Sequence, residues 1–151
     1  MNRTRVILLC LLSMLACACS SQPMMEKLAM QRLPKCLEKA MQQELDIPGG
    51  AEISSPQTVY VCDSLCIIIF EAVAKDHSGQ ELRFPVRYAL VRDGIMSAAT
   101  GQPYYAESIT GAPMMDSAEN EEFKQYCRKE GAKMYDYYVS VGEHVDLEEL
   151  R

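Results

Sequence analysis

The sequence predicts an α+β fold, with an N-terminal helix, a four-stranded antiparallel meander and a C-terminal helix packed on the sheet. Apolar residues recur at a helical period near the start of the chain and again near its end. Short apolar or alternating segments separated by turn residues lie between them, which is typical of antiparallel strands. We expect a leader at residues 1–18, a polar tether at 19–24 and a single α+β domain at 25–151, which is long enough to bury a core.

The first helix is expected from Met25 onwards. Pro34 interrupts its pattern, and a proline in a helix interior costs about 3 kcal/mol. Either the helix kinks there, or the main helix starts with Pro34 as its first residue. The turn residues at 46–50 end it. The apolar positions near the 3.6-residue period are Leu28, Ala29, Leu33, Cys36, Leu37, Ala40, Met41 and Leu45.

Four strands are expected after this helix, at 58–62, 65–74, 82–90 and 95–99. The third strand alternates apolar and polar residues, so one of its faces meets the core. The Asp-Gly pair at 93–94 is a good hairpin turn into the fourth strand.

The second strand is apolar on both faces at residues 66–70. A strand of this kind must be covered on both sides, so we expect a second helix or a partner protein there in addition to the N-terminal helix.

A long Gly/Pro-rich connection is expected at residues 100–116. It contains Tyr104, Tyr105, Met114 and Met115, which are candidates for a binding loop. A covering flap with a short edge strand is the alternative.

The last helix is expected to start at a capping box formed by Asp116 and Glu119. Gly131 weakens its middle. Its apolar side would carry Phe123, Tyr126, Cys127, Met134 and either Tyr137 or Tyr138.

The chain is acidic, with a net charge of −6. Without the two arginines of the leader, 13 basic residues face 21 acidic ones, which gives −8. This balance argues against nucleic acid as a partner and against an electrostatic attraction to anionic lipids. Acidity of this kind also simply keeps an exported protein soluble.

The sequence contains no recognisable catalytic constellation. His77 and His144 are the only histidines, and neither lies in a context that predicts a Ser-His-Asp arrangement. The spacing of Cys62 and Cys66 fits neither a redox CxxC motif nor a zinc site. We therefore expect a protein that is not an enzyme and that uses no cofactor or metal.

The first eighteen residues have the organisation of an export signal. Arg3 and Arg5 give a basic start, and residues 6–18 form an uncharged apolar run. Thirteen residues are too few to span a bilayer core, which needs about 20. The pattern therefore predicts a cleaved signal sequence.

Residues 15–18, Leu-Ala-Cys-Ala, and the following Cys19 resemble the lipobox of bacterial lipoproteins. The resemblance implies cleavage before Cys19 and a lipid anchor on its thiol, with Cys17 as a second candidate. An ordinary cleavage site before Cys19 is an alternative that would release a soluble protein. The absence of an acidic residue directly after Cys19 is similar to lipoproteins of the outer membrane, and the lack of an acidic cluster favours its periplasmic face.

Four cysteines would remain in an oxidising compartment: Cys36, Cys62, Cys66 and Cys127. They allow three pairings with two disulfides. We favour a disulfide between Cys36 and Cys127, which each lie on an apolar helix face. Cys62 and Cys66 flank a turn and form an alternative pair, and a free buried thiol is equally plausible for Cys66.

The sequence Asp-Ser-Leu-Cys at 63–66 runs into the apolar strand at 67–70 and ends in Ala-Lys-Asp at 74–76. This arrangement resembles small uncharacterised proteins of gut Bacteroidetes over residues 35–92. That group has no assigned activity, so the resemblance assigns no functional residue.

Together these features predict a non-enzymatic lipoprotein that binds a protein, an envelope component or a second copy of itself through the apolar sheet face or the 100–116 loop. The alternative is a periplasmic carrier whose helix and sheet enclose a small apolar ligand, as in cystatin-like folds.

Overall fold

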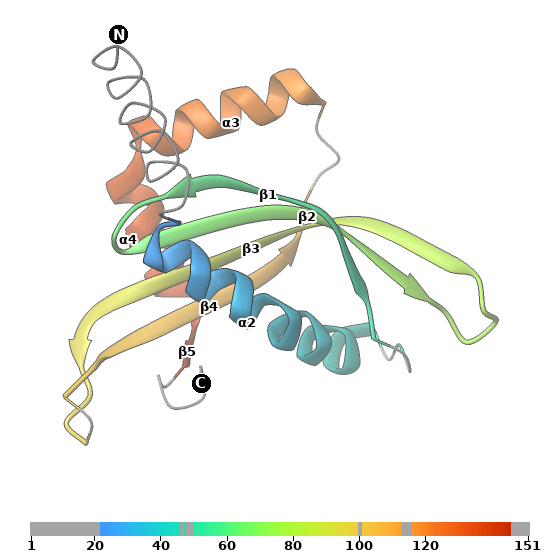
Figure 1. Ribbon diagram of the computed structural model, residues 1–151, viewed down its shortest axis with the longest axis horizontal. Coiled ribbons are helices and arrows are strands. Elements are labelled where there is room, and N and C mark those ends of the chain that lie inside the picture. Colours follow the sequence, from blue (N-terminus) through green and yellow to red (C-terminus); the bar gives the residue numbers. More distant parts are fainter. Residues whose placement is uncertain (1–21, 46, 48–49, 100, 113–115, 146–151) are drawn as a thin grey trace, which may run out of the picture.

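The computed structural model describes residues 22–45, 47, 50–99, 101–112 and 116–145 (Figure 1). The expected leader, both candidate lipidation residues Cys17 and Cys19, and Met114 and Met115 lie outside these residues. The α+β class is confirmed, but the sheet has five strands instead of four, in sequence order and all antiparallel. None of the described helices is long and apolar enough to cross a bilayer.

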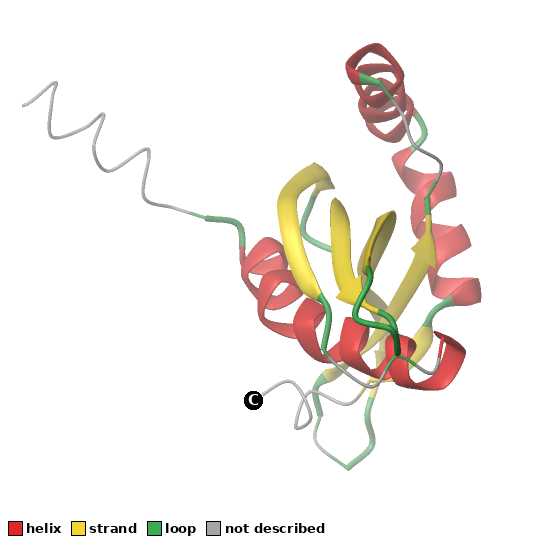
Figure 2. Cartoon of the chain, turned by 90° about the vertical axis from the view of Figure 1, so that its right-hand side faces the viewer, coloured by secondary structure: helices red, strands yellow, loops and turns green. Residues whose placement is uncertain are grey.

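The elements follow the chain in a simple order. They are helix α2 (Met24–Ala40), its π-helical continuation η1 (Met41–Leu45), strands β1 (Glu52–Val61), β2 (Leu65–Lys75), β3 (Glu81–Met96) and β4 (Pro103–Gly111), helices α3 (Ser117–Lys129) and α4 (Gly131–Val141), and strand β5 (Glu143–Val145). Figure 2 shows helices on both sides of the sheet.

Helix α2 runs through Pro34 without ending there. Pro34 lies on the exposed side of the helix, so the carbonyl that loses its partner can be hydrated. The opposite side is apolar and packs on the sheet. Its buried residues are Met25, Ala29, Leu33, Cys36 and Leu37.

The fourth strand was predicted in the wrong place. Strand β3 continues through Asp93 because the carboxylate of Asp93 is buried, where it accepts a hydrogen bond from the amide of Ile95 and lies 3.2 Å from Nε2 of His144. The hairpin turn comes later, where the amide of Ser97 donates to the carbonyl of Gln102. Strand β4 therefore occupies much of the segment that was expected to be a loop.

Alternate residues of the strands build two apolar clusters on opposite sides of the sheet. Cys66 and Ile68 face α2, whereas Leu65 and Ile67 face α3 and α4. The prediction that β2 needs cover on both faces is confirmed, and the C-terminal helices provide the second layer.

The predicted disulfide between Cys36 and Cys127 is not formed. Cys36 belongs to the cluster under α2 and Cys127 to the cluster under α3 and α4, so the sheet lies between them. Cys62 is exposed at the β1–β2 turn while Cys66 is buried, and all four are free thiols. Helix periodicity identified most residues of the apolar helix faces, although Tyr126 is 49% exposed, and it could not say which side of the sheet each face covers.

The C-terminal helix begins at the predicted capping box. The amide of Glu119 donates to Oδ1 of Asp116 at 2.8 Å, and the amide of Asp116 donates to Oε2 of Glu119 at 2.9 Å. The helix is then divided in two at Glu130. Gly131 starts the second part because a Cβ there would lie 2.7 Å from the hydroxyl oxygen of Tyr60.

Strand β1 forms one edge of the sheet, and its pairing with β2 is irregular. The register shifts between Ser54 and Gln57 and again between Thr58 and Tyr60. Ser55 has a positive φ of 53°, which is unusual for a residue other than glycine, and Pro56 follows it.

Candidate functional site

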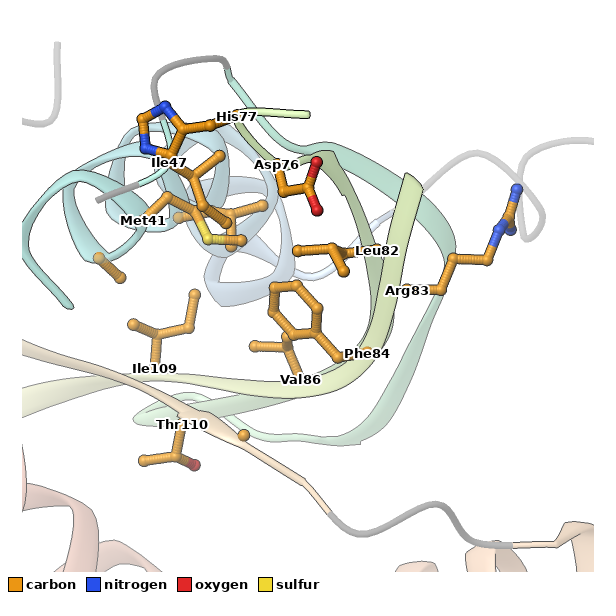
Figure 3. A pocket seen from close by; sticks show the side chains of 13 residues that line it. Met41, Ile47, Asp76, His77, Leu82, Arg83, Phe84, Val86, Ile109 and Thr110 are labelled. Atoms are coloured by element: carbon orange, nitrogen blue, oxygen red, sulfur yellow. The ribbon is translucent and has the colours of Figure 1, made fainter. Parts of the chain in front are cut away.

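A partly open cavity of about 560 Å³ lies between the end of α2, η1 and one end of the sheet (Figure 3). Its apolar lining residues are Leu37, Ala40, Met41, Ile47, Leu82, Phe84, Val86 and Ile109. The remaining lining residues are Asp76, His77, Arg83, Thr110 and Gly111.

The cavity arises because the strands differ in length. The pairing of β3 with β4 extends only to Val86, which lies opposite Gly111. The β2–β3 hairpin continues further, to the pair formed by Lys75 and Glu81. One further backbone bond follows, from the amide of Ala112 to the carbonyl of Pro85 at 3.0 Å. Residues 81–84 have no register partner from β4 within the described chain, so no described strand fills the space beneath the end of α2.

Strand alternation determines which side chains line this space. Leu82, Phe84 and Val86 of β3 point into the cavity together with Ile109 of β4, whereas Arg83 points away from it (Figure 3). The guanidinium of Arg83 instead bonds to the carboxylates of the β2–β3 hairpin, 2.9 Å from Glu71 and 2.6 Å from Glu81. The side chains that the sheet points into the cavity are therefore apolar, and the polar lining residues other than Arg83 lie at the β2–β3 turn and on β4.

The β2–β3 turn supplies the polar rim of the cavity. Asp76 and His77 lie there beside Ile47 (Figure 3). Oδ1 of Asp76 accepts hydrogen bonds from the hydroxyl and amide of Ser78, at 2.6 and 2.9 Å, and from the amide of Gln80 at 2.9 Å. The bonds from Ser78 and Gln80 hold the pKa of Asp76 below its usual value, so this carboxylate is charged at neutral pH.

A buried polar cluster lies further back under α2. Nε of Arg32 is 3.0 Å from both carboxylate oxygens of Glu107, and the hydroxyl of Tyr88 donates to Oε2 at 3.0 Å. Glu107 is only 6% exposed. Burial and the nearby charge of Glu107 raise the pKa of Tyr88 well above its usual value, so the phenol stays protonated. These bonds join α2 to β4, and both oxygens of the Glu107 carboxylate accept hydrogen bonds in them. The cluster is therefore a structural link between the two elements.

A second, smaller cavity of about 200 Å³ lies along β4 between α2 and α4. It is lined by Cys36 and Glu107, and by Tyr137 and Val141 on the α4 side. Burial raises the pKa of Cys36 to about 12, with a further contribution from the charge of Glu107. The thiol is therefore protonated at neutral pH and is a poor nucleophile.

Comparison with protein-family models, curated proteins and solved structures gives no match. Among the described residues, no three His, Cys, Asp or Glu side chains come together as a group that could hold a metal. The geometry of the larger cavity is therefore the main basis for an inference about function.

The structure does not bring the predicted binding-loop residues together as a site. Tyr105 is buried in the cluster under α2, and the half-buried Tyr104 packs edge-on against His144 with ring centroids 6.3 Å apart. Both belong to β4, while Met114 and Met115 lie outside the described residues.

A cavity between helix and sheet was the alternative that the sequence left open, but its position was not predicted, although the alternation of residues 82–90 supplies three of its lining residues. Alternation of apolar and polar residues predicts that one face of a strand meets the core, but a strand that lines a cavity shows the same alternation. The signal that separates them is the difference in length between β3 and β4, which depends on where β4 begins and ends.

Proposed function

We propose that this protein is a non-enzymatic binding protein that holds a small apolar ligand in the larger cavity beneath α2. The observation that carries this proposal is the size and lining of that cavity, about 560 Å³ with eight apolar residues around it. Ligand sites for small molecules measure about 300–1,000 Å³ and have apolar walls with few polar groups. The cavity has both properties.

The chemistry of the walls favours an apolar occupant over water. A stably bound water needs about two to four polar partners, whereas the side chains that β3 and β4 point into this cavity are apolar. An apolar ligand gains about 25 cal/mol for each Å² of apolar surface removed from water. Leu82, Phe84, Val86 and Ile109 present such surface from the sheet.

Parts of the surfaces that favoured a protein partner in the sequence are covered within the described chain, while Met114 and Met115 of the expected loop lie outside it. The second face of β2 packs against α3 and α4. Tyr105, from the expected binding loop, is 6% exposed and contributes to the core. These contacts support the ligand-carrier alternative over the protein-binding one.

We further propose that a lipid on Cys19 attaches the protein to a membrane of the cell envelope, on the periplasmic face of the outer membrane. The lipobox-like sequence supports this, and so does the short distance along the chain from Cys19 to the start of α2 at Met24. Five residues span at most about 18 Å when fully extended. The cavity would then lie near a bilayer, where apolar compounds accumulate.

The cavity is tested with a neutral apolar fluorophore, N-phenyl-1-naphthylamine, titrated into the mature chain (residues 19–151) with Cys19→Ser so that no lipid is attached. Ile109→Trp places an indole in the cavity, and we expect it to weaken binding by about tenfold or more. Ile95→Trp is the matched control, because Ile95 is 61% exposed on the β3–β4 hairpin. It should leave binding unchanged.

Two results would contradict the cavity proposal. One is the absence of binding by the folded parent chain. The other is equal binding by the Ile109→Trp and parent chains, since the fluorophore would then occupy another surface.

The anchor is tested in cells by metabolic labelling with a fatty-acid analogue and by separation of membranes. Cys19→Ser should abolish both labelling and membrane association, while Cys17→Ser should preserve them. Labelling that depends on Cys17 would move the anchor, and unchanged membrane association of the Cys19→Ser protein would refute it.

A further inference from the structure

We propose that the ligand of the larger cavity carries an amine or other cationic head group, and that Asp76 binds this group at the cavity rim. This inference rests on the proposed apolar-ligand function. It adds the class of ligand, an amphiphile with an apolar body and a positively charged end.

The geometry of Asp76 leaves part of its carboxylate outside the turn. The three hydrogen bonds from Ser78 and Gln80 all fall on Oδ1. They fix the side chain and favour its charged form, while Oδ2 takes no part in these three bonds. Asp76 thus combines a rigid position, a negative charge and a second oxygen for a ligand at the edge of an apolar cavity.

The other charged residue of the lining does not offset Asp76. Besides His77 of the same turn, whose charge also acts on Asp76, the lining cation is Arg83, and its guanidinium points away from the cavity (Figure 3). It is held there by Glu71 and Glu81. To bind an anionic head group, Arg83 would have to leave both carboxylates.

Electrostatics therefore discriminates between amphiphiles that fill the cavity equally well. A carboxylate head at the rim would meet the like charge of Asp76 in a protein whose net charge is already −6. An ammonium head would instead donate charge-assisted hydrogen bonds to Asp76, which are stronger than neutral ones. The apolar tail would lie against Phe84, Val86 and Ile109 in both cases.

The experiment compares three ligands with the same tail: dodecylamine, dodecanol and dodecanoate. Each is titrated below its micelle concentration into the Cys19→Ser mature chain at low salt and about pH 8, where histidine side chains carry little charge. We expect the amine to bind about tenfold or more tightly than the carboxylate, with the alcohol between them.

Asp76→Asn keeps an oxygen to accept the bonds of the turn but removes the charge. It should weaken amine binding by about tenfold and leave alcohol binding unchanged. Asp63→Asn is the matched control, because it removes the same charge from the exposed β1–β2 turn. It should preserve the preference for the amine. If Asp76→Asn does not fold, added salt should weaken binding of the amine to the parent chain and not that of the alcohol.

The outcomes separate the two proposals. If the carboxylate binds as tightly as the amine, if Asp76→Asn has no effect, if Asp63→Asn has the same effect, or if salt leaves amine binding unchanged, the head-group inference is wrong. Binding of the alcohol in those cases would keep the apolar-ligand function. If none of the three ligands binds to the folded parent chain, the proposed function itself is refuted.

Discussion

The two halves of the interface between α2 and the sheet are built differently. In the first half, residues 24–33 of α2 pack on the sheet, with Glu26 bonded to Thr58 at 2.7 Å and Arg32 paired with Glu107. In the second half, residues 37–45 of the helix and η1 lie over the larger cavity. We call these the closed half and the open half.

This comparison shows that the length of β4 determines where the interface between α2 and the sheet is closely packed. Both halves of the helix offer apolar residues at the same period. In the closed half, β4 lies beneath the helix and supplies Tyr105 and Glu107. Beyond Gly111 there is no β4, so the same helix faces a space that no strand occupies. A strand longer by a few residues would remove the proposed binding site.

Truncation of one leucine in each half should give the largest contrast. Leu33→Ala in the closed half should lower the free energy of unfolding by about 4 kcal/mol, because Leu33 is buried and a new cavity would form. Leu82→Ala in the open half should cost about 1 kcal/mol, because Leu82 is half-buried and already adjoins a cavity. Urea denaturation measures both, and equal losses would remove the distinction between the halves.

Removal of Glu107 should break the link between α2 and β4. In the Glu107→Ala protein, the guanidinium of Arg32 loses its carboxylate partner, although the Arg32 side chain is only 14% exposed. We therefore expect the free energy of unfolding, measured by urea denaturation, to fall by about 3 kcal/mol. Lys39→Ala is the control on the same helix. It breaks an exposed pair with Glu143 and should have a much smaller effect. A comparable loss in the control would mean that the buried position of Glu107 is unimportant.

Gly142, at the end of α4, lies in a closely packed region behind the closed half. A Cβ at this position would lie 2.8 Å from the carbonyl oxygen of Tyr138 and 2.9 Å from Cβ of Ala106, the residue before Glu107. Gly142→Ala should therefore lower the melting temperature, with a loss of about 2 kcal/mol, while ligand binding in the open half is unchanged. Gly94→Ala has open space around its new Cβ and should be close to neutral.

The last test compares the reactivity of the thiols, and its expected effect is the smallest because the assay requires no substitution that removes a contact. Partial burial opposes ionisation of Cys62, but hydrogen bonds from Ser64 and Tyr60 outweigh it and lower the pKa. Burial raises the pKa of Cys36 and Cys66 to about 12. At neutral pH a disulfide reagent should modify Cys62 quickly, and the fully buried Cys66 only when the closed half opens.

The control for this assay is a Cys62→Ser protein, which should lose the fast phase. A fast reaction of Cys66 in the native protein would show that α2 separates from the sheet readily and that the closed half is not closed. An absence of fast reaction would contradict the exposure of Cys62.

Sequence patterns predicted the parts of this fold that depend on local periodicity. The apolar positions of α2, the capping box at Asp116 and the need for two layers around β2 follow from residue spacing alone. Asp93 was misleading because its usual role in turns is replaced here by a buried carboxylate that lies 3.2 Å from Nε2 of the more exposed His144. The segment from Tyr104 to Thr110 has β-formers at both ends, Tyr104, Tyr105, Ile109 and Thr110, and could have been identified as a strand.

The candidate site could not be predicted in the same way. It depends on three segments that meet only in the folded chain: η1, the β2–β3 turn and the end of β4. The failed pairing of Cys36 with Cys127 has a related cause, because periodicity gives the face of a helix but not the side of the sheet that the helix covers.

The irregular pairing of the edge strand β1 affects how readily neighbouring molecules aggregate. Regular exposed edges offer rows of amide and carbonyl groups that recruit strands from neighbouring molecules, which leads to aggregation. In β1 the left-handed backbone at Ser55 and the missing amide hydrogen of Pro56 divide that row into short pieces. Molecules gathered on one lipid surface, as proposed for this chain, would thus be kept from joining edge to edge into continuous sheets.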